Sequence, residues 1–219
     1  MSLARSLERR LERLFEGAAG RVFSGRLHPS EMAGRIAREA DLTSFEHESG
    51  PATSNRYVLK VNPADLDVDP TRLQRRLELA LAEHAAEAGL RLEGPPTVLI
   101  ETSDAVSPGQ FTCVPSVMVG KIPPWARLVG ATSYDIGPNR ALVGRASDSD
   151  VVLPFEEVSR RHALIWRADS QVWIEDLGSV NGTVLDGIRI SSGPHRLNRG
   201  DMIGFSGHRF RFHEGSDRA

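Results

Sequence analysis

Residues 141–190 read ALVGRASDSDVVLPFEEVSRRHALIWRADSQVWIEDLGSVNGTVLDGIRI, and they decide the fold of the second half of the chain. Short apolar runs alternate there with Gly, Asp, Ser and Asn, and the same texture extends from Leu128 to the runs DMIGF and HRFRFH. Many short strands with frequent turn signals are typical of an all-β sandwich. Asp186-Gly187, between two apolar runs, predicts a tight hairpin. We therefore predict a β-sandwich over residues 127–214.

Three short motifs lie within this stretch, on loops between the expected strands. They are Gly144-Arg145, Ser159-Arg160-Arg161-His162 and Asn181-Gly182-Thr183. They place arginine, hydroxyl and amide groups at the tips of neighbouring loops. A phosphorylated threonine carries about −1.5 to −2 charge and three acceptor oxygens near neutral pH. A site for it needs a permanent cation and several N–H or O–H donors, and these motifs supply both.

The first two motifs provide the groups that would contact the phosphate. Arg145 carries a fork of N–H donors that does not deprotonate in proteins, so it suits a phosphate better than lysine does. Ser159 can donate its hydroxyl. Arg160 adds positive charge and backbone N–H groups from the same loop.

The third motif provides groups that would contact the peptide. Asn181 can use both ends of its amide on the peptide backbone beside the phosphothreonine and so fix its register. Ser179 and Val180 line the same loop, where they contribute backbone donors and an apolar wall for the threonine methyl group. Such a wall would favour phosphothreonine over phosphoserine.

Four stretches in this order resemble the forkhead-associated (FHA) family, whose members read phosphothreonine peptides. The stretches are ALVGRASDSDVVL, EEVSRRHALI, EDLGSVNGTVLDGIRI and RLNRGDMIGFSGHRFRF, with Asp186 where the family commonly has Asn. The resemblance covers about residues 127–213, and four fragments in order make it specific. It implies phosphate or peptide contact at Arg145, Ser159, Arg160, Val180 and Asn181. It implies a scaffold role at Gly144, His162 and Gly182.

The first 120 residues mix helical and strand patterns. Leucines at helical spacing predict a helix over 3–16, and Pro29 and Asp69-Pro70 mark the starts of two more helices. A polar loop is expected over TSFEHESGPATSN, at 43–55. Strands are expected in NRYVLKVNP, TVLIET and QFTCVPSVMV, the last with Pro115 at an edge or a bulge. The order α-α-β-α-β-β predicts a small α+β domain with helices packed on a short sheet.

The boundary between the two halves lies in GKIPPWARL, at residues 120–128. Pro123-Pro124 stiffens a connector of only a few residues. We therefore predict an α+β domain at 1–120, a proline-rich linker at 121–126 and the sandwich at 127–214.

The first half resembles the uncharacterised domain that precedes the FHA module in actinobacterial FhaA-type proteins. The resemblance lies in LERRLERLFEGAAGRVFSGRLHPSEMAGRIAREAD, NRYVLKVNPADL and SPGQFTCVPSV. A long disordered linker typically separates the two domains in that family, whereas here it is nearly absent. The family's tie to serine/threonine kinase signalling around cell-wall synthesis and division implies such a partner for this chain. The partner of the first domain is not indicated by its residues.

Composition narrows the classes of function. The chain has 219 residues, of which 40% are hydrophobic and 26% charged, as in an ordinary globular protein. A net charge of −2 gives no basic surplus for nucleic-acid binding. No run approaches the roughly 20 apolar residues of a membrane span. Cys113 is the single cysteine, which excludes an internal disulfide and suits a reducing compartment. We expect a cytoplasmic protein without membrane insertion.

Other functions remain as alternatives to a phosphothreonine-dependent adaptor. Ser159 and His162 could be a nucleophile and its base, but no third orienting acid is apparent, so we predict no enzyme activity. The seven histidines and one cysteine lack metal-ligand spacing, so we predict neither a metal nor a cofactor. The first alternative is a protein-interaction module that does not require phosphate. The second is a DNA-binding regulator that uses the N-terminal helices.

Overall fold

The computed structural model describes residues 27–66 and 69–215, so the helix predicted at 3–16 lies outside the described residues. The chain divides into two compact units. The described residues of the first unit fall within Met1–Phe45, Ala52–Ala85 and Leu92–Gly120. The second unit contains Lys121–Ala219 and also two short segments, Glu46–Pro51 and Ala86–Arg91. The sequence does not set these two segments apart from their neighbours.

Two helices start where the sequence predicts them. Helix α2 (Pro29–Leu42) begins after His28, whose side chain accepts a hydrogen bond from the Ser30 N–H. Helix α3 (Pro70–Glu87) begins after Asp69, whose Oδ1 accepts from the Thr71 N–H at 2.9 Å. In both helices proline takes the first position, where its missing N–H leaves no backbone bond unmade.

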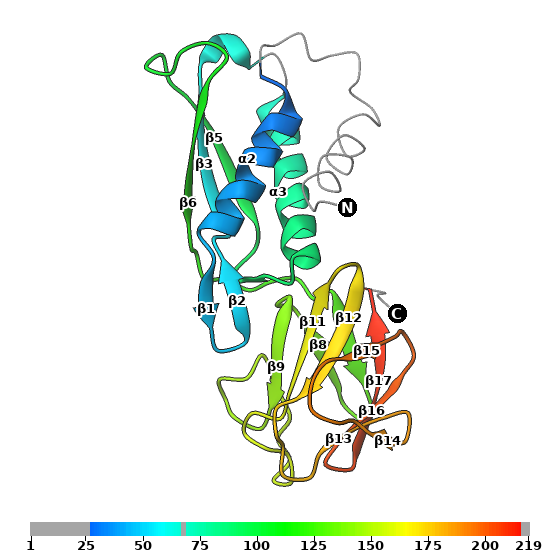
Figure 1. Ribbon diagram of the computed structural model, residues 1–219. Coiled ribbons are helices and arrows are strands. Elements are labelled where there is room, and N and C mark those ends of the chain that lie inside the picture. Colours follow the sequence, from blue (N-terminus) through cyan, green and yellow to red (C-terminus); the bar gives the residue numbers. More distant parts are fainter. Residues whose placement is uncertain (1–26, 67–68, 216–219) are drawn as a thin grey trace. The chain divides into compact units, whose positions relative to one another are not determined.

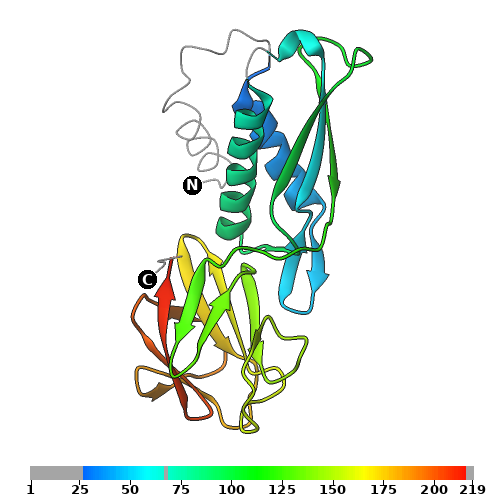
Figure 2. The same cartoon turned by 180° about the vertical axis from the view of Figure 1, so that it is seen from behind.

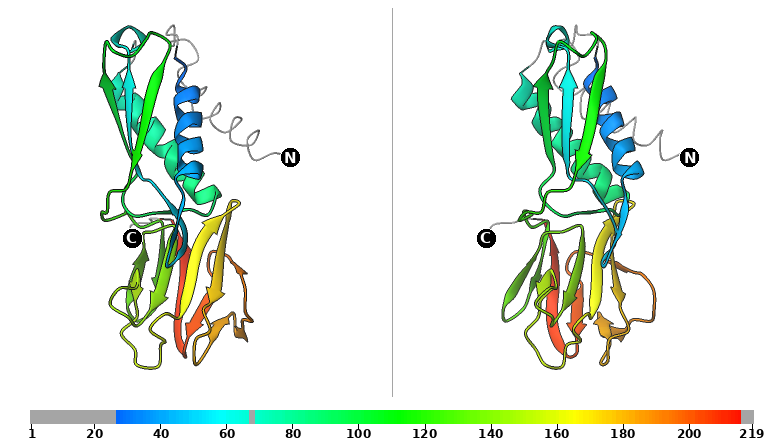
Figure 3. Two further views of the ribbon diagram at one scale, coloured as in Figure 1. Left: turned by 60° about the vertical axis from the view of Figure 1, so that its left-hand side comes forward. Right: turned by 90° about the vertical axis from the view of Figure 1, so that its left-hand side faces the viewer.

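These helices cover one face of a three-stranded sheet of order β5-β3-β6, as Figure 3 shows. Strand β3 (Arg56–Val61) pairs in parallel with β5 (Thr97–Thr102) and antiparallel with β6 (Phe111–Ser116). Alternate residues of β3 are buried within the helix–sheet core, in line with the period of two along a strand. Pro115 lies in the edge strand β6, as predicted, because it has no N–H to donate and an edge strand pairs on one side only. The short 3-10 helix η1 (Pro63–Asp65) follows β3.

The polar loop predicted at 43–55 is wrong, because two short strands form there. Strands β1 (Phe45–His47) and β2 (Gly50–Thr53) join β4 (Arg91–Leu92) in a sheet of order β1-β2-β4. Strands of two to four residues are too short to display alternation, and Gly50 reads as a turn signal. The residues therefore carried no strand pattern that could be recognised.

The second unit contains the predicted β-sandwich, seen from two opposite sides in Figures 1 and 2. One sheet has the order β10-β9-β11-β12-β15 and the other the order β14-β13-β16-β17-β7-β8. The strands of the first sheet are β9 (Arg140–Gly144), β10 (Val151–Val152), β11 (Ala163–Ala168), β12 (Gln171–Asp176) and β15 (His195–Leu197). The strands of the second are β7 (Ala126–Val129), β8 (Ser133–Ile136), β13 (Thr183–Leu185), β14 (Ile188–Arg189), β16 (Met202–Phe205) and β17 (His208–Glu214).

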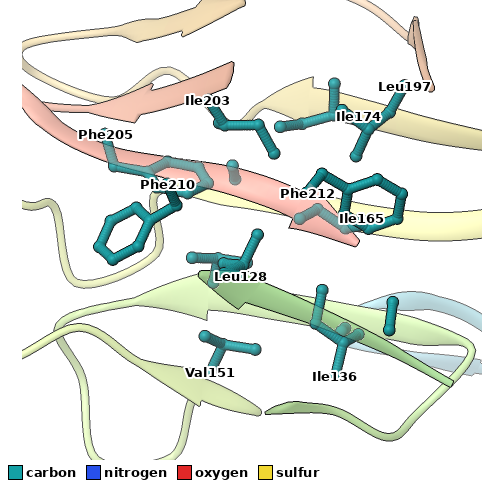
Figure 4. Packing of buried hydrophobic residues seen from close by; sticks show 14 of the residues in the cluster. Leu128, Ile136, Val151, Ile165, Ile174, Leu197, Ile203, Phe205, Phe210 and Phe212 are labelled. Carbon is teal, nitrogen blue, oxygen red and sulfur yellow. The ribbon is translucent and has the colours of Figure 1, made fainter. Parts of the chain in front are cut away.

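Apolar side chains from both sheets fill the space between them, as Figure 4 shows. Phe205 and Phe212 are fully buried, and Trp125 meets Phe212 edge to face with ring centroids 6.2 Å apart. Burying one such side chain stabilises a fold by about 1.5–3 kcal/mol. This core holds the strands rigidly, and the loops that join them project from a fixed frame.

The predicted hairpin at Asp186-Gly187 forms between β13 and β14. Both residues have positive φ, +48° and +85°, as the tight two-residue turn requires. The Asp186 carboxylate also accepts a hydrogen bond from the Met202 N–H at 2.8 Å.

Within residues 27–66 and 69–215, no helix combines the length and apolar composition needed to cross a bilayer.

Candidate functional site

Strand register brings the three predicted motifs to one end of the sandwich. Strand β11 lies between β9 and β12, and Ala163 pairs with Val143 on one side and with Asp176 on the other. The motifs follow Val143, precede Ala163 and follow Asp176. They therefore emerge from the same end of the sheet, as the ends of β9, β11 and β12 in Figure 1 show.

Ser159 links the other two motifs through direct hydrogen bonds. Its carbonyl accepts from the Arg145 N–H at 3.0 Å, and its Oγ accepts from the Val180 N–H at 3.1 Å. The Arg145 side chain is exposed, and its Nε donates to the Val158 carbonyl at 3.2 Å. That bond holds one edge of the guanidinium against the backbone of the Ser159 loop.

Other predicted contact residues surround Ser159 at the surface. Arg160 and Asn181 are exposed, and the Val180 side chain is 83% exposed although it is apolar. The Asn181 Nδ2 donates to the Glu157 carbonyl at 2.9 Å, which holds the amide in one orientation. The result is an exposed set of cationic, amide and apolar groups above a half-buried serine.

His162 lies beneath this set and joins two loops. Its side chain is fully buried, its Nδ1 accepts from the Ser159 N–H at 3.2 Å, and its Nε2 lies 3.3 Å from the Gly182 carbonyl. Burial lowers the pKa of His162, so the ring is neutral near pH 7. A neutral ring that accepts at Nδ1 donates at Nε2, and His162 therefore bridges the second and third motifs as one tautomer.

Asp176 organises the loop that leads to Asn181. Its carboxylate accepts from the Ser179 N–H at 2.8 Å, from the Ser179 hydroxyl at 2.6 Å and from the Thr183 hydroxyl at 2.6 Å. Burial alone would raise the pKa of Asp176, but these hydrogen bonds outweigh it and lower the pKa. Asp176 is thus a carboxylate near neutral pH and accepts all three bonds.

Ser179 has a different position from the other predicted contact residues. Both its N–H and its hydroxyl donate to Asp176, and its Oγ accepts from the Gly182 N–H at 2.9 Å. These bonds shape the loop from within. Direct contact between Ser179 and a ligand stays a prediction.

At two positions of the loops the structure shows why the residue is glycine. A Cβ on Gly144 would collide with the Arg160 carbonyl, so only glycine lets the first two motifs approach this closely. Gly182 has φ of +80°, which favours glycine, and a Cβ there would lie only 2.5 Å from the Arg189 Nε. Both glycines permit close approach of neighbouring chain segments.

The roles of four residues in this arrangement escaped the sequence interpretation. The buried Thr183 and the partly buried Asp176 support the third motif, and Asp176 with Ser179 three residues later is a recognisable turn-forming pattern. Glu157 acts through its backbone carbonyl, which no residue type could reveal. Arg189 reaches Gly182 only because β14 folds back along β13.

Two family models match the chain. The model described as FhaA, N-terminal domain, matches residues 4–114, and the model described as FHA domain matches residues 141–206. The first match covers about half of the 219 residues.

Two curated relatives illustrate the range of similarity. The FHA domain-containing protein FhaB of Mycolicibacterium smegmatis is 39% identical over 64 residues, which are 29% of this chain and 41% of that protein. The transcriptional regulatory protein EmbR of Mycobacterium bovis is 28% identical over 193 residues, which are 82% of this chain and 50% of that protein. The chain therefore matches half or less of the length of these relatives.

Solved structures also resemble the chain. The FhaA FHA domain complexed with the intracellular domain of Rv3910 is 26% identical, with a TM-score of 0.36, and the match covers 40% of this chain and 96% of that one. Mycobacterium tuberculosis EmbR in complex with a low affinity phosphopeptide is 21% identical, with a TM-score of 0.41, and the match covers 99% of this chain and 52% of that one.

Proposed function

We propose, from the premise that this chain belongs to the FhaA N-terminal domain family and carries an FHA domain, that it is an adaptor that binds phosphothreonine peptides. The FHA domain is a non-catalytic binding module. One observation carries the proposal: Ser159 hydrogen-bonds both to Arg145 and to the residue before Asn181, below their exposed side chains. These are the cation, hydroxyl and amide that a phosphothreonine peptide needs.

The exposed side chains of these loops supply the charge, the hydrogen bonds and the apolar contact that the peptide needs. The Arg145 guanidinium and the charge of Arg160 attract the phosphate dianion, and charge-assisted hydrogen bonds are the stronger kind. The Asn181 Nδ2 is engaged by Glu157, so its Oδ1 is oriented to accept from a peptide N–H. Val180 offers an apolar surface to the threonine methyl group. In this proposal Gly144, His162 and Gly182 support the loops.

The proposal also covers the chain's setting. A phosphothreonine reader acts downstream of serine/threonine kinases. Because these kinases need ATP, which is found in the cytoplasm, the proposed location of the adaptor is cytoplasmic. The partner is a kinase or one of its substrates, in cell-wall synthesis or division as the family resemblance implies. The proposed domains are 1–120, which engages a second partner, and 127–214, which binds the phosphopeptide, joined by 121–126.

Replacing Arg145 tests the proposal directly. A phosphothreonine peptide selected by the wild-type chain from a randomised library is titrated by calorimetry against Arg145→Ala. Hydrogen bonds to charged groups contribute about 1.5–3 kcal/mol each, so losing two weakens binding about 100-fold or more. The control, Arg209→Ala, removes an exposed arginine of β17 and leaves the affinity within about twofold of wild type.

Two further measurements distinguish the alternatives. The unphosphorylated peptide binds too weakly to detect if the proposal holds, and equal binding of both peptides would instead indicate a phosphate-independent module. Affinity for the phosphopeptide falls below about pH 6, where the phosphate takes up its second proton. Equal affinity of Arg145→Ala and wild type would refute the assignment of the site.

A further inference from the structure

Two short segments of the second compact unit come from far outside the sandwich in sequence. Glu46–Pro51 and Ala86–Arg91 belong to the same unit as Lys121–Ala219. Both lie within residues 4–114, which the FhaA N-terminal model matches. Their contacts with the sandwich include the two loops that carry the proposed phosphate-binding residues.

The first contact is a largely enclosed ion pair between Arg91 and Asp150. Nη1 and Nη2 of Arg91 lie 2.8 and 2.9 Å from the two carboxylate oxygens, and the side chains are 9% and 14% exposed. Asp150 Oδ2 also accepts from the Leu142 N–H at 2.8 Å, and Arg91 Nη1 donates to the Arg140 carbonyl at 2.6 Å. A planar fork on a carboxylate fixes orientation as well as distance.

Asp150 ends the loop that begins at Arg145. Within it, the Ala146 N–H donates to the Arg160 carbonyl at 3.2 Å, and the Ser149 Oγ lies 3.4 Å from the same oxygen. This loop therefore hydrogen-bonds to the neighbouring loop that carries Ser159. Fixing its far end at Asp150 fixes the course of both loops.

The second contact holds that neighbouring loop directly. Arg161 follows Ser159 and Arg160, and its guanidinium forms an ion pair with the Glu48 carboxylate. Its Nη2 also donates to the Glu48 carbonyl at 2.8 Å. The two bonds attach the loop to the chain turn between β1 and β2, 113 residues away in sequence.

Further bonds hold the two segments themselves in place. The Arg140 guanidinium donates to the Ser49 and Gly89 carbonyls and stacks on the Trp166 ring, 4.9 Å from its centroid. Asn139 Nδ2 donates to the Leu90 carbonyl at 3.0 Å. Both segments are thus attached at several points, so the residues that touch the loops are themselves fixed.

We propose that Arg91 and Glu48 are positioning residues of the phosphothreonine site. Arg91 acts through Asp150 on the loop that carries Arg145. Glu48 acts through Arg161 on the neighbouring loop. The inference rests on the proposed function, and it means that residues matched by the FhaA N-terminal model help to set the affinity of the FHA loops.

Full-chain variants test the inference with the same labelled phosphothreonine peptide, followed by fluorescence anisotropy. Arg91→Lys keeps the charge but loses the two-pronged geometry, and Glu48→Gln removes the ion pair. The controls are Arg75→Lys and Glu83→Gln, which make the same two substitutions at exposed positions of α3. Circular dichroism confirms that each variant is folded at the assay temperature.

The expected result is a loss of affinity in folded protein. Arg91→Lys weakens binding about tenfold relative to Arg75→Lys, and Glu48→Gln weakens it about threefold relative to Glu83→Gln, as suits an exposed pair. A purely structural role would lower the melting temperature and leave the affinity of the folded protein unchanged. If Arg91→Lys does not fold, Glu48→Gln decides alone.

Failure of this inference differs from failure of the proposed function. Wild type that binds the phosphopeptide while both folded variants bind equally well would overturn the positioning role and leave the adaptor function standing. Wild type that does not distinguish the phosphorylated peptide from its unphosphorylated form would remove both.

Discussion

Each compact unit contains a fully buried threonine whose hydroxyl donates a hydrogen bond, but the two bonds support different parts of the fold. In the first unit, the fully buried Thr53 donates its hydroxyl to the Ala40 carbonyl at 2.5 Å, which ties strand β2 to helix α2. In the second unit, the fully buried Thr183 donates to the Asp176 carboxylate at 2.6 Å, which supports the loop below Asn181. Thr53 satisfies a buried acceptor and Thr183 a partly buried one, but only Thr183 adjoins a loop that carries exposed groups of the candidate site.

Asn55 and His162 extend the comparison. The buried Asn55 donates to the Pro95 and Met118 carbonyls and accepts from the Met118 N–H, so it joins chain segments of the first unit. The buried His162 joins two loops whose outer side chains are charged or amide-bearing. A buried polar network alone therefore does not indicate a binding site. Function is expected where such a network supports exposed side chains of matched chemistry.

The largest expected effects lie in the two apolar cores, where the units should behave alike. Leu77 and Leu128 are both fully buried, one in each core. Leu77→Ala and Leu128→Ala each lower the free energy of unfolding by about 2–5 kcal/mol, through lost burial and the cavity left behind. Urea denaturation measures both. Leu79→Ala, at a position 58% exposed on α3, is the control and changes stability by less than about 0.5 kcal/mol.

The matched threonines separate stability from binding. Thr53→Val and Thr183→Val each lower the free energy of unfolding by about 1–3 kcal/mol, because each takes one donor from an acceptor that is buried or partly buried. Only Thr183→Val weakens phosphothreonine-peptide binding, by about tenfold, since only it loosens the loop that carries Asn181. Denaturation and anisotropy on the same samples give both values. Equal effects of the two variants on affinity would remove the distinction between the units.

Much of both units could be predicted from local patterns. Proline and aspartate mark the starts of α2 and α3, alternation marks β3, and Asp186-Gly187 marks a hairpin, because each signal acts within a few residues. The three motifs could be grouped because each lies at the end of a strand in a family-like order. That Ser159 joins them through its carbonyl and hydroxyl could not be read from residue types.

The parts that escaped prediction depend on contacts between distant residues. Strands β1, β2 and β4 are too short to alternate, and their pairing depends on partners elsewhere in the chain. The attachment of Arg161 to Glu48 spans 113 residues and has no local signature. Asp176 looks like an ordinary turn aspartate until the fold places Thr183 against it. Local patterns therefore predicted the candidate site, and the structure supplied the network that joins its loops.

A smaller effect is the pH dependence of stability that the buried His162 gives to the second unit. Burial lowers the pKa of His162 in the folded chain below its usual 6.5, so between those two values the unfolded chain binds more protons. Stability is therefore lost as pH falls below about 6.5, by at most about 1.4 kcal/mol per pH unit from this group. Nuclear magnetic resonance of the ring nitrogens follows the titration directly. An imidazole that titrates at or above 6.5 would contradict the neutral bridge.

The smallest effects are expected at surface ion pairs, where the units should again agree. Lys60 and Glu101 lie 4.0 Å apart in the first unit, with side chains 50% and 52% exposed. Arg127 and Asp135 lie 2.7 Å apart in the second, with side chains 44% and 54% exposed. Because water screens such pairs, replacing either pair by neutral residues changes the free energy of unfolding by less than about 1 kcal/mol.

Double-mutant cycles on the two pairs measure these couplings without the background of each single change. The shorter pair, Arg127–Asp135, should give the larger coupling, and neither cycle should alter phosphopeptide affinity. A coupling well above 1 kcal/mol at either pair, or a change in phosphopeptide affinity, would show that the two units also differ in the effect of their surface ion pairs. Two small couplings with unchanged affinity would leave the buried polar networks, and not these two surface pairs, as the difference between the units.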